Sequence, residues 1–114
     1  MMDCIFCRIA AGEIPATIVA RTDHAIAFRD LHPQAPTHLL VVPTEHVGSA
    51  AHLSRGAAAR VLGEIAALAT TVAAELGLEA GYRMVINTGP EGGQTVDHLH
   101  LHLLGGRQFH WPPG

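Results

Sequence analysis

His98-Leu99-His100-Leu101-His102-Leu103-Leu104 is the stretch of this sequence that most narrows the fold. Side chains of a β-strand alternate between the two faces of a sheet. The stretch therefore predicts a strand with leucines on one face, available to a core, and three histidines on the other. An imidazole costs free energy when it is buried without partners, and it titrates near neutral pH. Packing gives no reason for a row of them, so the pattern indicates a functional face.

The three histidines are spaced too widely to share one metal ion. Residues four apart on a strand lie about 13 Å from one another, so we expect separate roles along one face. The central residue, His100, has a histidine about 6.6 Å away on each side. An imidazole can act as a nucleophile toward phosphorus or carbonyl carbon. His98 and His102 are then placed to set the tautomer of His100 or to bind substrate oxygens.

A loop rich in glycine and small polar residues, 87–95, comes directly before the histidine segment. Such a loop can bring backbone N–H groups against a phosphate. By itself the composition indicates no more than a turn. Its position immediately before three histidines favours an anion-binding site.

The remaining elements predict an α+β domain. A long helix is expected from Ser54, a favourable N-cap, to Leu76, because apolar residues between them form one stripe and Gly77 follows. A short helical turn is expected over 4–11, strands over 17–21, 25–29, 38–42 and 82–87, and a loop over 32–36. Strands on both sides of a single long helix indicate a mainly antiparallel sheet of five strands.

Length and composition limit the class of protein. The 114 residues, 48% of them hydrophobic, correspond to one domain, 1–114. The net charge of −3 argues against binding to nucleic acid. We find no apolar run of membrane-spanning length and no signal-peptide pattern at the N-terminus, so no membrane partner is expected. Two cysteines do not make a disulfide framework, and a cytoplasmic location is predicted.

The histidine segment resembles the signature of the histidine triad (HIT) family of nucleotide hydrolases and transferases. The resemblance extends to residues 30–38, 81–87 and 105–114 and so covers nearly the whole chain. The C-terminal ten residues are similar to those of the Hint branch of the family. The resemblance implies the HIT-like fold over the whole of 1–114.

The resemblance also implies a chemistry. His100 would attack the α-phosphorus of a purine nucleoside 5′-phosphoramidate, breaking the P–N bond through a nucleotidyl-histidine intermediate without a catalytic metal. His102 would bind a phosphate oxygen. His38 would hydrogen-bond the nucleophilic ring and set its tautomer, and Thr95 would lie near the leaving nitrogen.

Binding residues follow from the same resemblance. Asp30 would accept both ribose hydroxyls of an AMP-like nucleotide, and Asn87 and the Gly93 N–H would contact the phosphate. The base would lie in an apolar pocket made by Ile5, Phe6, Ile9, Phe28, Leu31 and Leu40. A tryptophan near the chain end, Trp111, is expected to be buried, and in the Hint branch it would reach the active site of the partner in a C₂ homodimer.

The pair Cys4-Ile5-Phe6-Cys7 has three interpretations: a redox pair, two reduced structural cysteines, or half of a zinc site. The chain lacks the strand context of a thioredoxin-like redox motif. In relatives of the C-x-x-C type, the resemblance implies two further ligands, which here are His46 and His98. A closed Cys₂His₂ site would hold structural zinc.

Three other functions stay open at this point. The same histidine could serve a dinucleoside polyphosphate hydrolase or a nucleotidyl transferase. The chain could also be a non-catalytic nucleotide-binding scaffold, or a zinc-handling protein.

Overall fold

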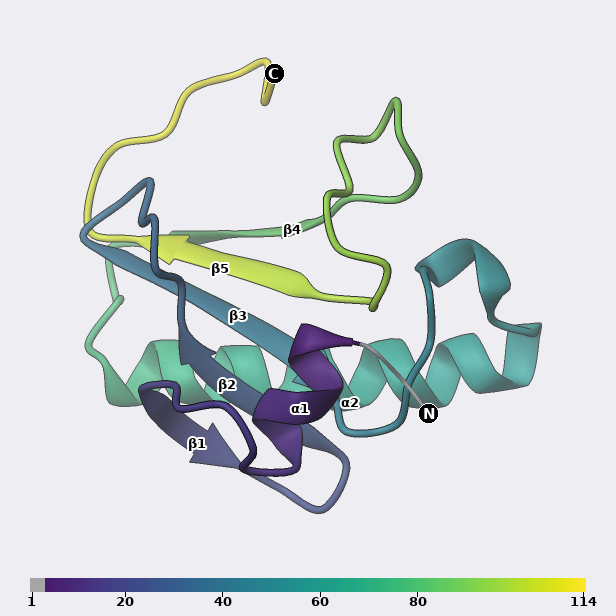
Figure 1. The fold of residues 1–114 in the computed structure, drawn as a ribbon. Coiled ribbons are helices and arrows are strands. Elements are labelled where there is room, and N and C mark those ends of the chain that lie inside the picture. The colour runs from purple at the N-terminus through teal and green to yellow at the C-terminus, as the bar shows by residue number, and fades with distance from the viewer. Residues whose placement is uncertain (1–3) are drawn as a thin grey trace.

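One antiparallel sheet organises the chain, with strand order β1-β2-β3-β5-β4 (Figure 1). The computed structural model describes residues 4–114, so the first three residues of the N-terminal stretch, in which we found no signal-peptide pattern, lie outside it. The strands are β1 (Ile18–Arg21), β2 (Ala25–Arg29), β3 (Thr37–Pro43), β4 (Tyr82–Ile86) and β5 (Leu101–Gly105). The helices are α1 (Ile5–Ala10), a 3₁₀ turn η1 (Ala50–His52) and α2 (Arg55–Glu75). The predicted α+β fold is confirmed.

The two faces of the sheet carry separate cores, as the period-two alternation requires. On one face, Leu39, Leu101 and Leu103 pack against the buried stripe of α2. On the other face, Phe28 and Leu40 pack against α1, so the two helices lie on opposite sides of the sheet (Figure 1). The histidine side chains belong to the α1 face.

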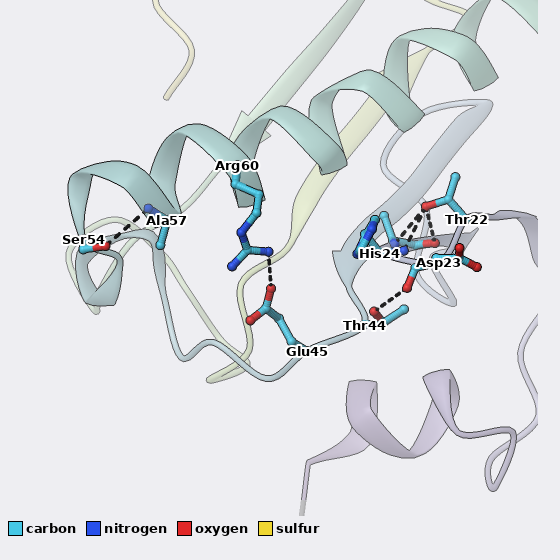
Figure 2. A network of polar contacts seen from close by, with 9 residues as sticks. Thr22, Asp23, His24, Thr44, Glu45, Ser54, Ala57 and Arg60 are labelled. Atoms are coloured by element: carbon cyan, nitrogen blue, oxygen red, sulfur yellow. Dashed lines mark hydrogen bonds and ion pairs between the residues drawn. The ribbon is translucent and has the colours of Figure 1, made fainter.

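Local signals define the ends of α2 as predicted. The Ser54 hydroxyl accepts a hydrogen bond from the Ala57 N–H at 3.3 Å (Figure 2), and Gly77 follows the helix at φ +73°. Arg60 of α2 donates to Glu45 at 2.8 Å, and both side chains are exposed. This contact ties α2 to the loop after β3.

The helix α2 differs from one sequence-based expectation. Its 21 residues are long and apolar enough, by length and composition alone, to cross a membrane, whereas we found no such run. Its many alanines raise the hydropathy without forming the run of large apolar residues that we looked for. The helix buries six residues, Val61, Ile65, Leu68, Ala69, Val72 and Ala73, and packs along the sheet as the core helix.

The predicted histidine strand begins later than expected. Ladder pairing starts at Leu101, so only His102 of the three histidines lies within β5. The chain before it bends at residues 96–98 and lies outside the ladder, where the Leu99 N–H donates to the Val47 carbonyl at 2.7 Å. The alternation of faces nevertheless continues through this segment, with Leu99 in the α2-side core.

Candidate active site and metal centre

The central histidine is held in one tautomer by its neighbour's backbone. His100 Nδ1 lies 2.7 Å from the carbonyl oxygen of His98. A carbonyl oxygen only accepts, so Nδ1 carries the proton and donates it. In the neutral ring Nε2 therefore keeps its lone pair, and this atom makes no hydrogen bond within residues 4–114. The ring is buried and presents one nucleophilic nitrogen.

A chain of hydrogen bonds sets the tautomer of His102. The Gln34 N–H donates to His38 Nδ1 at 3.0 Å, so His38 carries its proton on Nε2. Nε2 in turn lies 2.9 Å from His102 Nδ1 and 3.4 Å from Asp30 Oδ2. His102 Nδ1 therefore accepts, and its proton is on Nε2. The neutral ring of His102 thus presents an N–H donor.

Both rings of this pair are neutral near pH 7. Burial, with a smaller effect of the neighbouring His100 and His38, lowers the pKa of His102 to about 4, although the Asp30 carboxylate opposes this shift. Burial also lowers the pKa of His38, although the Asp30 carboxylate opposes this shift. A neutral donor can bind a phosphate oxygen without requiring an acidic medium.

The role that we expected for His38 is wrong in one respect: its ring contacts His102 and not His100. In the β3–β5 register His38 pairs with Leu104, and Leu40 pairs with His102. His102 is therefore the diagonal neighbour of His38, whereas His100 lies four residues from the paired position and before β5 begins. The His98 carbonyl orients His100 instead.

A pocket of about 300 Å³ opens beside the rings of His100 and His102. It brings together residues that lie far apart in the sequence, because His100, His102, Thr95 and Asp30 all line it. Its apolar wall contains all six residues expected to contact a base: Ile5, Phe6, Ile9, Phe28, Leu31 and Leu40. The pocket can thus receive an apolar ring system next to a nucleophile and a neutral N–H donor.

Three expected contacts do not line this pocket. Asn87 follows β4, and the Gly93 N–H is donated to the Pro90 carbonyl at 3.1 Å. Trp111 is 83% exposed in the isolated chain, so its expected burial would require a second molecule. The C-terminal segment before it is nevertheless anchored, because Arg83 donates to the His110 carbonyl at 2.7 Å.

A second cluster lies where α1 meets the segment before β5. Cys4 caps α1, Cys7 lies within it, and the ligand atoms of both lie within 4.8 Å of those of His46 and His98. His98 Nδ1 is 3.3 Å from Cys4 Sγ and 3.5 Å from Cys7 Sγ. His46 Nδ1 is 3.3 Å from Cys7 Sγ. The structure thus brings together all four residues expected to bind zinc.

This donor set fits a tetrahedral metal ion. Zinc bonds to sulfur and nitrogen imply a sulfur–nitrogen separation of about 3.6 Å. His98 Nε2 donates to the Pro43 carbonyl at 3.0 Å, which leaves the Nδ1 lone pair directed at the sulfurs. Burial and the neighbouring Cys4 sulfur raise the pKa of Cys7 to about 11, so two thiolates here need a cation between them.

A third group, Asp30, His38 and His102, also has its ligand atoms within 4.8 Å of one another. The hydrogen bond from the Gln34 N–H argues against a metal ion there. If His38 bound a metal through Nε2, its neutral ring would carry the proton on Nδ1, facing another N–H donor. This group is therefore a hydrogen-bonded relay.

The sequence did not reveal several contributors to the site. The His98 carbonyl and the Gln34 N–H are backbone groups, which carry no residue-type signal. Gln94 binds three loop segments: its amide donates to the Gly48 and Val96 carbonyls at 2.7 and 2.9 Å and accepts from the Gly89 N–H at 3.0 Å. Only its place in the glycine-rich loop could have drawn attention to it.

Fold and site together define a small α+β hydrolase domain that carries a triad of histidines beside a pocket. The family model of the HIT domain matches residues 11–109. A HIT family hydrolase from Legionella pneumophila is 50% identical, with a TM-score of 0.94 over 98% of this chain and 100% of that one. The chain belongs to the HIT family.

Two plant relatives have names that describe what those proteins bind or act on. The maize 14 kDa zinc-binding protein is 48% identical over 96% of this chain and 87% of its own length. Adenylylsulfatase HINT1 from Arabidopsis thaliana is 46% identical over 96% of this chain and 76% of its own length.

Proposed function

We propose that this chain hydrolyses the P–N bond of purine nucleoside 5′-phosphoramidates, with His100 as the nucleophile. The observation that carries the proposal is the 2.7 Å contact between His100 Nδ1 and the His98 carbonyl, which leaves a Nε2 lone pair at the pocket. The apolar wall would take the base, and the Asp30 carboxylate would take the ribose hydroxyls.

The reaction proceeds in two displacements at the α-phosphorus. His100 Nε2 forms a bond to phosphorus while the bond to the amine nitrogen breaks, and the departing nitrogen takes a proton, for which we assign the Thr95 hydroxyl. Water then attacks the same phosphorus, returns one proton to the Thr95 oxygen and breaks the bond to His100, releasing the nucleoside monophosphate. The Nδ1 proton stays on the ring throughout, so the nucleotidyl-imidazole is cationic and a good leaving group.

Hydrogen-bond donors would stabilise the charge that develops on the phosphoryl oxygens. His102 presents its Nε2–H as a neutral donor because His38 occupies Nδ1. A donor that is already oriented needs no reorganisation as the reaction proceeds. The relay from Gln34 through His38 would thus keep His102 in the state that binds phosphate.

The Arabidopsis relative favours a second candidate, the hydrolysis of adenylylsulfate. The nucleoside part of that substrate is the same, and His100 would again attack the α-phosphorus. The bond that breaks is then the one from phosphorus to the bridging oxygen, and sulfate leaves. The two candidates differ only in the leaving group.

Side-by-side turnover of adenosine 5′-phosphoramidate and adenylylsulfate distinguishes the two candidates. His100→Ala should abolish both activities while AMP binding, measured by calorimetry, stays measurable. His24→Ala, an exposed histidine in the β1–β2 turn (Figure 2), should leave the rates unchanged. Undiminished turnover in His100→Ala would contradict the proposed nucleophile. A strong preference for adenylylsulfate would replace the first candidate by the second.

We also propose that Cys4, Cys7, His46 and His98 hold zinc in a structural role. The close approach of the four ligand atoms and the plant relatives named for zinc binding support this assignment. Four protein ligands close the tetrahedron, so the ion would cross-link α1 to the rest of the fold. Metal analysis of the reduced protein should find one zinc per chain, lost in Cys7→Ser and retained in the control variant His52→Ala.

We propose further that the chain forms a homodimer through β4. This edge strand exposes three large apolar residues of one face, Tyr82, Met84 and Ile86, and α2 does not extend over them as it does over the other strands. A second copy that pairs along the edge would cover both the strand and this face. It would also give the exposed Trp111 a surface to pack against.

The oligomeric state tests this interface. Met84→Arg should shift sedimentation from dimer to monomer, because it places a charge at the centre of the apolar patch. Ile18→Arg is the matched control, since Ile18 is similarly exposed on the opposite edge strand, β1. A wild-type monomer, or a Met84→Arg dimer, would count against the proposal.

A further inference from the structure

Helix α1 contributes to both sites. Cys4 and Cys7 belong to the metal cluster, whereas Ile5, Phe6 and Ile9 form part of the wall of the pocket. The residues of the two sites are interspersed over about two helical turns. A change in the position of the helix therefore changes both sites. Figure 1 shows α1 lying across the sheet beside the segment that leads into β5.

Phe6 contacts both histidines that connect the two sites. Its ring meets the His98 ring edge-on at 5.8 Å between centroids and the His100 ring at 5.2 Å. His98 offers Nδ1 to the metal cluster and its carbonyl oxygen to His100 Nδ1. The pair His98 and His100 therefore joins the sulfur atoms of Cys4 and Cys7 to the ring of the proposed nucleophile.

A helix of this length depends on its surroundings. Six residues make too few hydrogen bonds to be stable alone, so tertiary contacts must hold α1 in place. On its sheet-facing side it packs through Phe6 and Ile9. The cross-link through Cys4 and Cys7 is the contact that would join it to both His46 and His98.

We propose that metal binding at Cys4, Cys7, His46 and His98 is thermodynamically coupled to nucleotide binding, with Phe6 as the positioning residue that links the two sites. This inference rests on the proposed function. With the metal bound, α1 would be held against the His98–His100 segment, so the apolar wall and the His100 ring would be arranged before the nucleotide arrives. Without the metal, the free-energy cost of ordering the helix would weaken the observed binding of the nucleotide.

Coupling between two sites is reciprocal. AMP should therefore bind the zinc-loaded protein at least about five-fold more tightly than the metal-free protein. Saturating AMP should raise the affinity for zinc by the same factor. AMP binding is measured by calorimetry, and zinc binding by competition with a chromophoric chelator in a reducing buffer.

Two phenylalanines in the pocket provide a matched pair of variants. Phe6→Leu should bring the affinity ratio between zinc-loaded and metal-free protein toward one, because the contact with His98 and His100 is lost. Phe28→Leu removes a ring from the same pocket, but this ring belongs to β2 and meets the Phe6 ring at 5.6 Å between centroids rather than His98 or His100. It should weaken AMP binding equally in both forms and leave the ratio unchanged. If Phe6 had only a structural role, Phe6→Leu and Phe28→Leu would affect the ratio of AMP affinities in the same way.

Hydrogen exchange gives a readout independent of ligand affinity. The Arg8 and Ala11 N–H groups bond to the Cys4 and Cys7 carbonyls, both at 3.0 Å. Metal removal should accelerate exchange in peptides covering α1 and leave α2 protected.

The possible outcomes separate this inference from the proposed function. Equal AMP affinity with and without zinc would overturn the coupling and leave the proposed function intact. Failure of the zinc-loaded protein to bind AMP would overturn both. Absence of zinc binding, or global unfolding of the metal-free protein, would overturn the coupling, because no local link through α1 would then remain.

Discussion

His38 Nε2 lies 2.9 Å from His102 Nδ1, and this contact joins the strands β3 and β5 on the face that carries the pocket. Together with the His98 carbonyl, this contact gives His102 and His100 different roles. His102 becomes an N–H donor through a side chain, and His100 becomes a lone-pair donor through a backbone carbonyl. Each tautomer is determined by the atom that the other ring nitrogen faces.

Loss of the His38 ring should impair catalysis more than binding. In His38→Ala, His102 is free to adopt the tautomer that cannot donate from Nε2. Since one hydrogen bond to a charged group contributes about 1.5–3 kcal/mol, we expect kcat to fall about ten-fold or more. Steady-state kinetics on the phosphoramidate, with AMP affinity measured separately, check this expectation. A loss confined to AMP affinity would contradict the relay.

Stability should decrease as the pH falls below the ordinary pKa of histidine. The unfolded chain binds a proton at His102 near pH 6.5, whereas the folded protein binds it only near pH 4. Between these values the unfolded state binds more protons, so acid favours unfolding. The lowered pKa of His38 acts in the same direction. The contribution is complete above pH 6.5 and is lost as the pH falls through 4.

Urea unfolding of the metal-free protein between pH 7.5 and 4.5 measures this dependence. His102→Gln should flatten it, because Gln does not titrate and can still accept from His38. His24→Ala, which removes an exposed histidine, should keep the wild-type slope. An identical slope in wild type and His102→Gln would contradict the assigned shift.

Gln94 should stabilise the loop that carries Thr95. Its amide makes three hydrogen bonds to separate segments, so Gln94→Ala should lower the free energy of unfolding by about 1–3 kcal/mol. Turnover should fall as well, because Thr95 would be less well positioned. Glu91→Ala, an exposed substitution in the same loop, is the control and should change neither quantity. Wild-type stability and turnover in Gln94→Ala would show that the loop is held by other contacts.

Two glycines of the α2 region should respond to alanine in opposite directions. Gly63 is exposed within the helix with open space at its Cβ position, so Gly63→Ala should stabilise the protein by about 0.5–1 kcal/mol. Gly77 ends the helix at φ +73°, where a side chain is strained, so Gly77→Ala should destabilise it by about 1–2 kcal/mol. Thermal unfolding of the pair tests both signs.

Local patterns predicted most of the fold. The spacing of apolar residues, Ser54 and Gly77 together defined α2 to within about one residue at each end. The alternation of leucine and histidine correctly separated the two faces of the segment before and within β5. These features depend on backbone geometry and nearby residues, which a sequence displays directly.

Sequence patterns failed where a result depends on strand register or on backbone atoms. The start of β5 was misplaced because the Leu99 N–H pairs with Val47, far away in the chain. The family resemblance assigned His38 to the ring of His100, and residue types could not correct this, because they do not reveal which diagonal neighbour the register selects.

The sequence by itself determined the alternating faces, the core helix and the presence of histidine and cysteine side chains suited to phosphorus chemistry and metal binding. Only the tertiary structure decided which nitrogen of each ring is free, because the His98 carbonyl, the Gln34 N–H and the Pro43 carbonyl occupy the others. It also decided that the metal cluster and the pocket share α1. Backbone groups are chemically alike at every position, so their placement, and the tautomers that they impose, follow from the folded arrangement alone.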